Sequence, residues 1–220
     1  MEYQVISTIQ QEQLIVIVRG VKKEQLIPMA EALWRGGIRL LETTYSANGS
    51  VSDEETAEHI QMLAKHFEGR MYIGAGTVLT QRQVELTHAA GGTFIISPDT
   101  YTPVIQKTKA LGLVSIPGAL TPSEITAAHR AGAYFVKLFP VTSLGSAYVK
   151  AVRAPLSHVP LLAVGGVDET NMEEYLRAGI AGFGVGSNIT NKQMLLEENY
   201  EGIEALAKSY TAVIKQWQTI

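Results

Sequence analysis

The sequence predicts a closed (β/α)8 barrel of the TIM type, built as a single α/β domain over residues 1–220. Apolar strand-like runs alternate with amphipathic helical stretches along the chain, and no Pro-, Gly- or Ser-rich linker separates them. The runs are continuously apolar, which is typical of parallel strands that are covered on both faces. Eight such runs in 220 residues leave about 27 residues per unit, enough for a strand, a helix and two short loops.

The predicted strands are eight short apolar runs. They span residues 14–18, 38–44, 71–78, 93–97, 113–118, 134–139, 160–166 and 181–187. Helical spacing is clearest in residues 24–35, 53–67, 123–131, 168–178 and 200–217. The segment Thr121-Pro122-Ser123-Glu124 predicts a helix start, with a capping Thr, a Pro at the first helical position and an acidic first turn. Glycines are placed to end helices before the next strand, namely Gly36, Gly37, Gly91, Gly92, Gly112, Gly132 and Gly179.

An open, doubly wound sheet is the alternative arrangement for alternating strands and helices. Such a sheet commonly carries Gly-x-Gly-x-x-Gly after its first strand. Here the first run ends in Val18-Arg19-Gly20-Val21, which lacks that turn. The barrel is therefore the favoured fold.

Composition restricts the class of function. The chain has 18 basic and 21 acidic residues and a formal charge of -3, whereas a nucleic-acid-binding protein carries a basic face. It contains no cysteine, which excludes disulfides, thiol catalysis and thiolate metal ligands. The first residues are polar, unlike a secretory signal, and no apolar run is long enough to span a membrane. We expect a cytoplasmic protein with neither nucleic-acid nor membrane partners.

Lys137 is the sharpest indication of chemistry, because active sites of such barrels lie at the carboxyl ends of the strands. Side chains alternate along a strand, so Phe135, Lys137 and Phe139 share one face while Val136 and Leu138 share the other. If the aliphatic pair packs against the outer helices, Lys137 points into the barrel. Burial lowers the pKa of an amine and favours a Schiff base with a keto substrate. The alternative is a structural lysine that reaches solvent or pairs with a carboxylate.

Glu42 ends the second run and shares a face with the apolar Ile38 and Leu40, so it is also predicted to point inward. A carboxylate at the barrel mouth near a lysine can act as a general acid and base. The alternative is a buried ion pair with Lys137 or Arg19, and the two roles are compatible.

Two glycine turns follow the seventh and eighth runs, where barrels often bind phosphate through backbone N–H groups. They contain Gly165 and Gly166 in the first turn, and Gly186 and Ser187 in the second. Glycine lets the backbone approach an anion closely, and the Ser187 hydroxyl can donate as well. The alternative is a pair of ordinary tight turns.

Arg19 and Thr77 end the first and third runs. The Arg19 guanidinium can hold a carboxylate or phosphate, or form a salt bridge inside the barrel. The Thr77 hydroxyl can donate to a carboxylate, or cap the following helix.

The histidines argue against a metal site or a serine nucleophile. Four lie in helical stretches and one in a loop, so none ends a strand where ligands or a general base would have to converge. All are expected to be solvated surface residues: His59, His66, His88, His129 and His158.

Taken with these residues, the chain resembles the class I aldolases that cleave 2-keto-3-deoxy-6-phosphogluconate (KDPG), 2-keto-4-hydroxyglutarate (KHG) and 2-keto-3-deoxy-6-phosphogalactonate. The resemblance runs almost end to end, from Val16 to Ser187. The matching segments are Val16-Ile17-Val18-Arg19, Gly36-Gly37-Ile38, Leu41-Glu42, Ile73-Gly74-Ala75-Gly76-Thr77-Val78, Ser97-Pro98, Ile116-Pro117-Gly118, Lys137-Leu138-Phe139-Pro140, Gly165-Gly166-Val167 and Gly186-Ser187.

The resemblance implies a role for each site residue. Lys137 would be the Schiff-base lysine and Glu42 the general acid and base. The residues implied to hold the substrate are Arg19, Thr77, Pro98 and Phe139, and those implied to hold its phosphate are Gly165, Gly166, Gly186 and Ser187. It further implies a homotrimer that acts on a small phosphorylated keto sugar acid without a metal or organic cofactor.

Two positions depart from the gluconate-type pattern. Ser46 stands four residues after Glu42, where those enzymes usually carry an arginine, and Val164 stands before the glycine pair, where they usually carry a threonine. The phosphogalactonate-cleaving relatives resemble this chain at the second position. The substrate carboxylate must then be held differently.

The expected reaction is a reversible retro-aldol cleavage to pyruvate and glyceraldehyde 3-phosphate. The alternatives are a sugar-phosphate epimerase or isomerase on the same kind of barrel, and a non-catalytic barrel that binds a metabolite.

Overall fold

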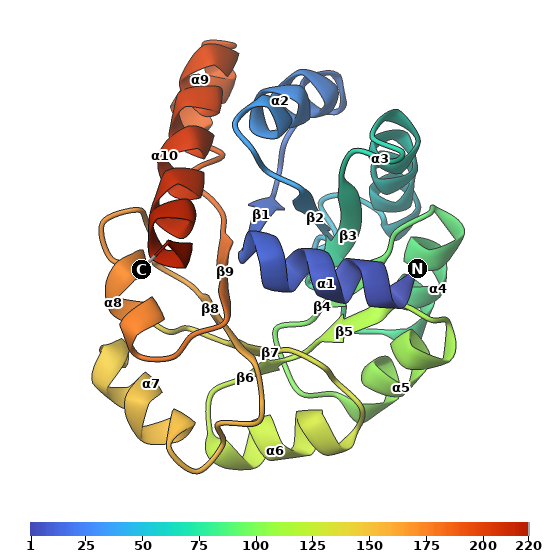
Figure 1. The fold of residues 1–220 in the computed structure, drawn as a ribbon. Helices are drawn as coiled ribbons and strands as arrows, with labels where there is room; N and C mark the ends of the chain where they lie inside the picture. Colours follow the sequence, from blue (N-terminus) through green and yellow to red (C-terminus); the bar gives the residue numbers. More distant parts are fainter. Residues whose placement is uncertain (220) are drawn as a thin grey trace.

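In the computed structural model, which describes residues 1–219, parallel strands form a barrel inside a ring of helices (Figure 1). The strands are β1 (Leu14–Val18), β2 (Leu40–Thr44), β3 (Tyr72–Gly76), β4 (Phe94–Ile96), β5 (Val114–Ile116), β6 (Gly118–Ala119), β7 (Val136–Leu138), β8 (Leu161–Val164) and β9 (Gly182–Val185). The helices are α1 (Glu2–Glu12), α2 (Lys23–Arg35), α3 (Asp53–His66), α4 (Gln81–Ala89), α5 (Thr102–Ala110), α6 (Pro122–Arg130), α7 (Gly145–Arg153), α8 (Met172–Arg177), α9 (Lys192–Leu196) and α10 (Tyr200–Gln218). None of the helices in this part of the chain combines the length and apolar character needed to cross a bilayer.

One interrupted strand closes the barrel. The strand order is β5-β4-β3-β2-β1-β9-β8-β7-β6, and all neighbouring pairs are parallel. Only Pro117 separates β5 from β6, so the two ends of this order are halves of a single strand. Proline cannot donate to the ladder, but the Pro117 carbonyl still accepts from the Lys137 N–H at 2.9 Å. With β5 and β6 taken together, the predicted (β/α)8 barrel is confirmed.

The two faces of each strand pack as the alternation predicts. Val136 and Leu138 belong to the cluster between the strands and the outer helices. Phe135 belongs to a second cluster inside the barrel, with Leu40 and Phe94. Lys137 and Glu42 follow the inner residues of their strands by two positions, so they face the interior.

Local signals set several helix boundaries. The predicted start of α6 is confirmed, because Thr121 and Glu124 form a reciprocal capping box. α8 begins later than residue 168, because Oδ1 of Asp168 accepts from the backbone N–H groups of Thr170 and Asn171. These bonds form a turn that competes with the helix.

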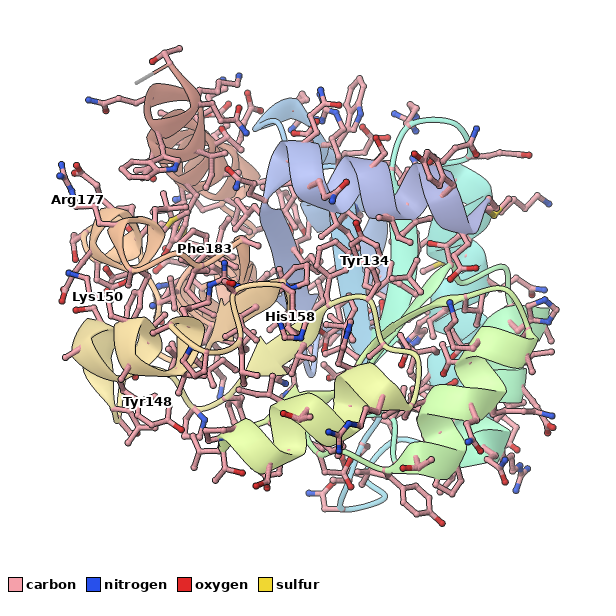
Figure 2. All side chains as sticks on the ribbon, turned by 60° about the horizontal axis from the view of Figure 1, so that its bottom comes forward. Tyr134, Tyr148, Lys150, His158, Arg177 and Phe183 are labelled. Atoms are coloured by element: carbon pink, nitrogen blue, oxygen red, sulfur yellow. The ribbon has the colours of Figure 1, made fainter. Side chains whose placement is uncertain are left out.

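Helix α1, which lies outside the predicted helical stretches, covers the amino end of the barrel (Figures 1 and 2). Val5 and Ile9, four residues apart on one helix face, are buried in the inner cluster. Gln10 donates to the Tyr134 hydroxyl at 3.0 Å, just before β7. With this end closed, the interior opens at the carboxyl ends of the strands.

Candidate active site

Lys137 and Glu42 lie on opposite walls of the barrel interior, since β2 and β7 are four strands apart in either direction around the closed sheet. The exposed fraction is 2% for Glu42 and 8% for Lys137. Within residues 1–219, Glu42 takes part in no salt bridge, and its Oε2 atom has no hydrogen-bond partner. The alternative of a direct structural ion pair is therefore absent from the described residues.

Burial shifts the pKa of both groups toward the neutral form. Loss of hydration raises the pKa of Glu42 to about 7, and the positive charges of Lys137 and Arg19 oppose this rise. Burial lowers the pKa of Lys137, while Glu42 opposes that change and Arg19 adds to it. A carboxyl group with a pKa near neutrality can both accept and return a proton. An amine with a lowered pKa is more readily available as a neutral nucleophile.

Gly76 makes room for the Glu42 carboxyl group. A Cβ atom at position 76 would overlap Oε1 of Glu42, and Gly74 leaves similar room for the Phe94 ring. Gly76 is a site residue that the motifs did not assign a role. Its signal is the Gly-x-Gly alternation on the strand beside β2, which predicts two inward positions without side chains.

Arg19 and Thr77 meet at the mouth of the barrel, where Nη2 of Arg19 donates to Oγ1 of Thr77 at 3.1 Å. Thr77 has a φ of 56°, a left-handed backbone conformation that is uncommon for threonine. Strained conformations of this kind cluster at functional sites, where the surroundings hold them in place. The two predicted residues are therefore in direct contact, and the Arg19 charge acts on both Glu42 and Lys137.

Phe139 and Pro98 border the lysine. Nζ of Lys137 lies 4.6 Å from the centre of the Phe139 ring, a cation–π distance. Phe139 is 38% exposed, so this contact is at the opening of the interior. The Pro98 carbonyl lies against Gly118, where any side chain would collide with it, and Gly118 pairs with Lys137. Pro98 is thus one strand away from the lysine.

The two glycine turns lie next to each other, because they follow the paired strands β8 and β9. The predicted residues in them are Gly165, Gly166, Gly186 and Ser187. Gly165 and Gly166 have φ values of 95° and 77°, which L side chains rarely adopt. Asn188 donates to the Val167 carbonyl at 3.2 Å and ties the two loops together. Ser187 is exposed, so its hydroxyl faces solvent at the mouth.

The two departing positions contribute neither a cation nor a free hydroxyl. Ser46 donates to Oδ1 of Asn48 at 2.7 Å, and its oxygen lies 2.8 Å from the Ser50 hydroxyl. These contacts hold Ser46 in the loop after β2. Val164, the last residue of β8, is buried.

The prediction that every histidine is a solvated surface residue is wrong for His59. It is 7% exposed on the inner face of α3, and its Nε2 atom is buried without a hydrogen-bond partner. Burial lowers the pKa of His59. The helical pattern alone did not show which turn of α3 packs against the barrel. Among residues 1–219, no three His, Asp or Glu side chains gather in a way that could hold a metal ion.

Two cavities lie at opposite ends of the barrel. One of about 390 Å³ lies beside the ends of β1 and β2, where Arg19 and Thr77 border it together with Leu26 of α2 and Thr56 and His59 of α3. A larger one of about 1220 Å³ lies at the amino end between α1, α3 and α4 and includes none of the predicted site residues. We place the site at the carboxyl ends of the strands, because this end holds the Glu42 carboxyl and the Lys137 amine, although neither residue lines the smaller cavity.

Known proteins resemble this chain over nearly all of its length. The family model described as KDPG and KHG aldolase matches residues 5–206. A probable 2-dehydro-3-deoxy-6-phosphogalactonate aldolase of Rhizobium meliloti (strain 1021) is 36% identical over 201 residues, covering 91% of this chain and 92% of the relative.

Two solved structures share the architecture. One described as native KDPGal has a TM-score of 0.84 and 28% identity, covering 94% of this chain and 96% of the other. The KDPG aldolase of Legionella pneumophila, with pyruvate captured as a covalent carbinolamine intermediate, has a TM-score of 0.82 and 30% identity, covering 93% and 96%. Together with the match to the family model, these likenesses show that the chain belongs to the KDPG and KHG aldolase family.

Proposed function

We propose that the protein is a class I aldolase that cleaves a 2-keto-3-deoxy-6-phospho sugar acid to pyruvate and glyceraldehyde 3-phosphate. The observation that carries this proposal is a lysine buried inside the barrel opposite a carboxyl group with which it forms no direct ion pair. Membership of an aldolase family supports it, as does the carbinolamine captured in the Legionella enzyme.

The first step is attack of the neutral Lys137 amine on the C2 ketone. A new C–N bond forms, and the carbinolamine loses its hydroxyl group as water to leave an iminium ion. The lowered pKa of Lys137 favours this step, because a larger fraction of the amine is unprotonated.

Carbon–carbon cleavage follows. Glu42 takes the proton of the C4 hydroxyl, the C3–C4 bond breaks, and its electron pair moves to the iminium to form an enamine. Glyceraldehyde 3-phosphate leaves, Glu42 returns its proton to C3, and water releases pyruvate from Lys137. A group that accepts and then donates one proton works best with a pKa near the working pH, as burial provides for Glu42.

The remaining predicted residues hold the two ends of the substrate. Arg19 and Thr77 lie together on one side of the mouth, where a guanidinium and a hydroxyl suit the carboxylate. The turns after β8 and β9 lie together and offer backbone N–H groups to the phosphate. Pro98 and Phe139 border the lysine between these ends.

We further propose that the C4 epimer with the galactonate configuration is the preferred substrate. Two features support this preference: the 36% identity with a probable phosphogalactonate aldolase, and the valine at position 164. The ratio of kcat/KM for the two epimers tests it, and a higher value for the gluconate epimer would reverse the assignment. We also propose a single-domain cytoplasmic homotrimer, which light scattering of the purified protein and cell fractionation test.

The decisive experiment is incubation with pyruvate and sodium borohydride, followed by peptide mass spectrometry. Reduction of an iminium would leave a stable adduct confined to Lys137, while the matched variant Lys137→Met would acquire none. A folded protein that gains no adduct in excess pyruvate would remove the class I mechanism. That outcome would favour the epimerase or the metabolite-binding barrel, neither of which needs an iminium.

A further inference from the structure

Thr44 is a polar residue at the mouth to which the proposed reaction has so far given no role. It is the last residue of β2 and lies two positions after Glu42, so both side chains are on the inner face of the strand. Thr43, between them, faces the outer helices and is 4% exposed. Thr44 is half-buried, which places its hydroxyl where the interior meets solvent.

The contact between Arg19 and Thr77 passes over Thr44. Arg19 follows β1 and Thr77 follows β3, and β2 lies between these two strands. Their 3.1 Å hydrogen bond therefore spans the end of β2, where Thr44 pairs with Gly76. All three residues also border the cavity of about 390 Å³, which Thr43 and His59 border as well.

The hydrogen-bonding capacity of this corner is unused. Thr77 accepts from Arg19 through its oxygen, so its own hydroxyl proton remains free to donate. Within residues 1–219, the Thr44 hydroxyl makes no hydrogen bond, whereas nearby Ser46 is engaged with Asn48 and Ser50. One guanidinium and two hydroxyl donors thus point to an anionic, oxygen-bearing group.

We infer that the Thr44 hydroxyl donates to the carboxylate of the keto acid, alongside Arg19 and Thr77, and selects substrates that carry a carboxylate beside the ketone. This inference rests on the proposed function, since it requires a substrate bound at Lys137. Thr44 follows Glu42 by two positions on the inner face of β2, so a carboxylate held in this corner lies one alternation beyond the proposed general base. Thr44 is then a specificity-determining residue.

The test compares two neighbouring threonines on opposite faces of β2. Thr44→Val removes the hydroxyl with little change in shape, Thr44→Ala removes it a second way, and Thr44→Ser retains it. Thr43→Val is the matched control, because the buried Oγ1 of Thr43 has no partner to lose. The readout is the pyruvate concentration that gives half-maximal borohydride trapping on Lys137, with methyl pyruvate as the probe that lacks the charge.

Loss of a hydrogen bond to a charged group should raise the half-saturating pyruvate concentration about 10-fold in Thr44→Val and Thr44→Ala. The same loss should reduce the ratio of the half-saturating concentration of methyl pyruvate to that of pyruvate by about the same factor. The half-saturating concentration of glyceraldehyde 3-phosphate should stay unchanged in both variants. Thr44→Ser and Thr43→Val should bind pyruvate as the parent protein does.

Several results would overturn the inference. They are unchanged pyruvate saturation in a folded Thr44→Val or Thr44→Ala, equal losses for pyruvate and methyl pyruvate, and an equal loss in Thr43→Val. If the unmodified protein itself gains no adduct with pyruvate, the proposed function fails instead, so the two failures are distinguishable.

Discussion

The two ends of the barrel are built from the same strands but bury side chains of different kinds. At the amino end, Leu40 of β2 and Phe135 before β7 pack in an apolar cluster beneath Ile9 of α1. Two residues farther along each chain segment, the same inner face carries Glu42 and Lys137, which are almost as fully buried. The change from apolar to ionisable side chains thus takes place within one alternation of the strand.

The contrast shows where stability and activity are placed. Burial of apolar side chains at the closed end stabilises the fold and leaves no side-chain polar group without a hydrogen-bond partner in that cluster. At the open end, burial of a carboxyl and an amine without direct pairing costs stability but moves both pKa values toward neutrality. We expect substitutions at the open end to change rate more than stability, and those at the closed end to do the reverse.

Lys137→Met should have the largest effect, because it extends the apolar character of the closed end to the mouth. We expect the retro-aldol rate to fall by on the order of 10⁴-fold or more, since the covalent route is lost. The melting temperature should stay the same or rise, because a buried amine is replaced by an apolar side chain of similar length. A coupled assay for pyruvate release and thermal unfolding measure the two quantities.

Lys150→Met is the control for this substitution. Lys150 is exposed on α7, outside the barrel (Figure 2). Its variant should keep the parent rate. A fully active Lys137→Met protein would contradict the assignment of the open end to catalysis.

Glu42→Gln should lower kcat by about 10²- to 10⁴-fold, because the amide cannot exchange a proton. It should also change how stability depends on pH. The carboxyl titrates near 4.5 in the unfolded chain and about 7 in the folded protein, so the folded state holds more protons between these values. The free energy of unfolding contributed by Glu42 therefore falls as pH rises from about 4.5 to about 7.

Urea unfolding at several pH values checks this prediction, by comparing the free energy of unfolding of the parent protein with that of Glu42→Gln. His59 contributes the opposite slope, because its pKa is lowered by burial, but it does so equally in both proteins. The parent protein should lose more stability than Glu42→Gln across this range. Parallel curves would mean that Glu42 has an ordinary pKa.

Gly76→Ala should reduce activity by about 10²-fold, because the new methyl group displaces the Glu42 carboxyl from its place. Gly74→Ala adds the same group one alternation lower on β3, against the Phe94 ring. It should reduce the melting temperature and spare the rate of the folded enzyme. The measurement is kcat per active site for the two variants, with the active sites counted by trapping pyruvate with borohydride. Equal losses of kcat in Gly76→Ala and Gly74→Ala would contradict the assignment of activity to the open end.

Ile9→Val should have the smallest effect. Removal of one buried methylene group at the closed end should cost about 0.5–1.5 kcal/mol of stability without changing kcat. Tyr3→Phe is the control on the same helix, because Tyr3 is 84% exposed and should be neutral. A change in kcat for Ile9→Val would show that α1 influences the open end.

Strand alternation predicted the orientation of Lys137 and Glu42 because it depends only on residues adjacent in the chain. The capping box at Thr121 and Glu124 was predictable for the same reason. His59 and α1 were not, since their burial depends on which segments pack against them. Gly76 and Thr44 become informative only when β1, β2 and β3 are set side by side.

By itself, the sequence determined the alternation of strands and helices, the inward lysine and glutamate, and the glycine turns, because each is a pattern among neighbouring residues. Only the tertiary structure decided that Glu42 and Lys137 face each other without a direct ion pair, that α1 closes one end, and that Arg19 reaches Thr77 across β2. The physical reason is that desolvation and charge interactions sum over all surrounding segments. A pKa, a cavity or a contact between distant residues therefore exists only once those segments are assembled.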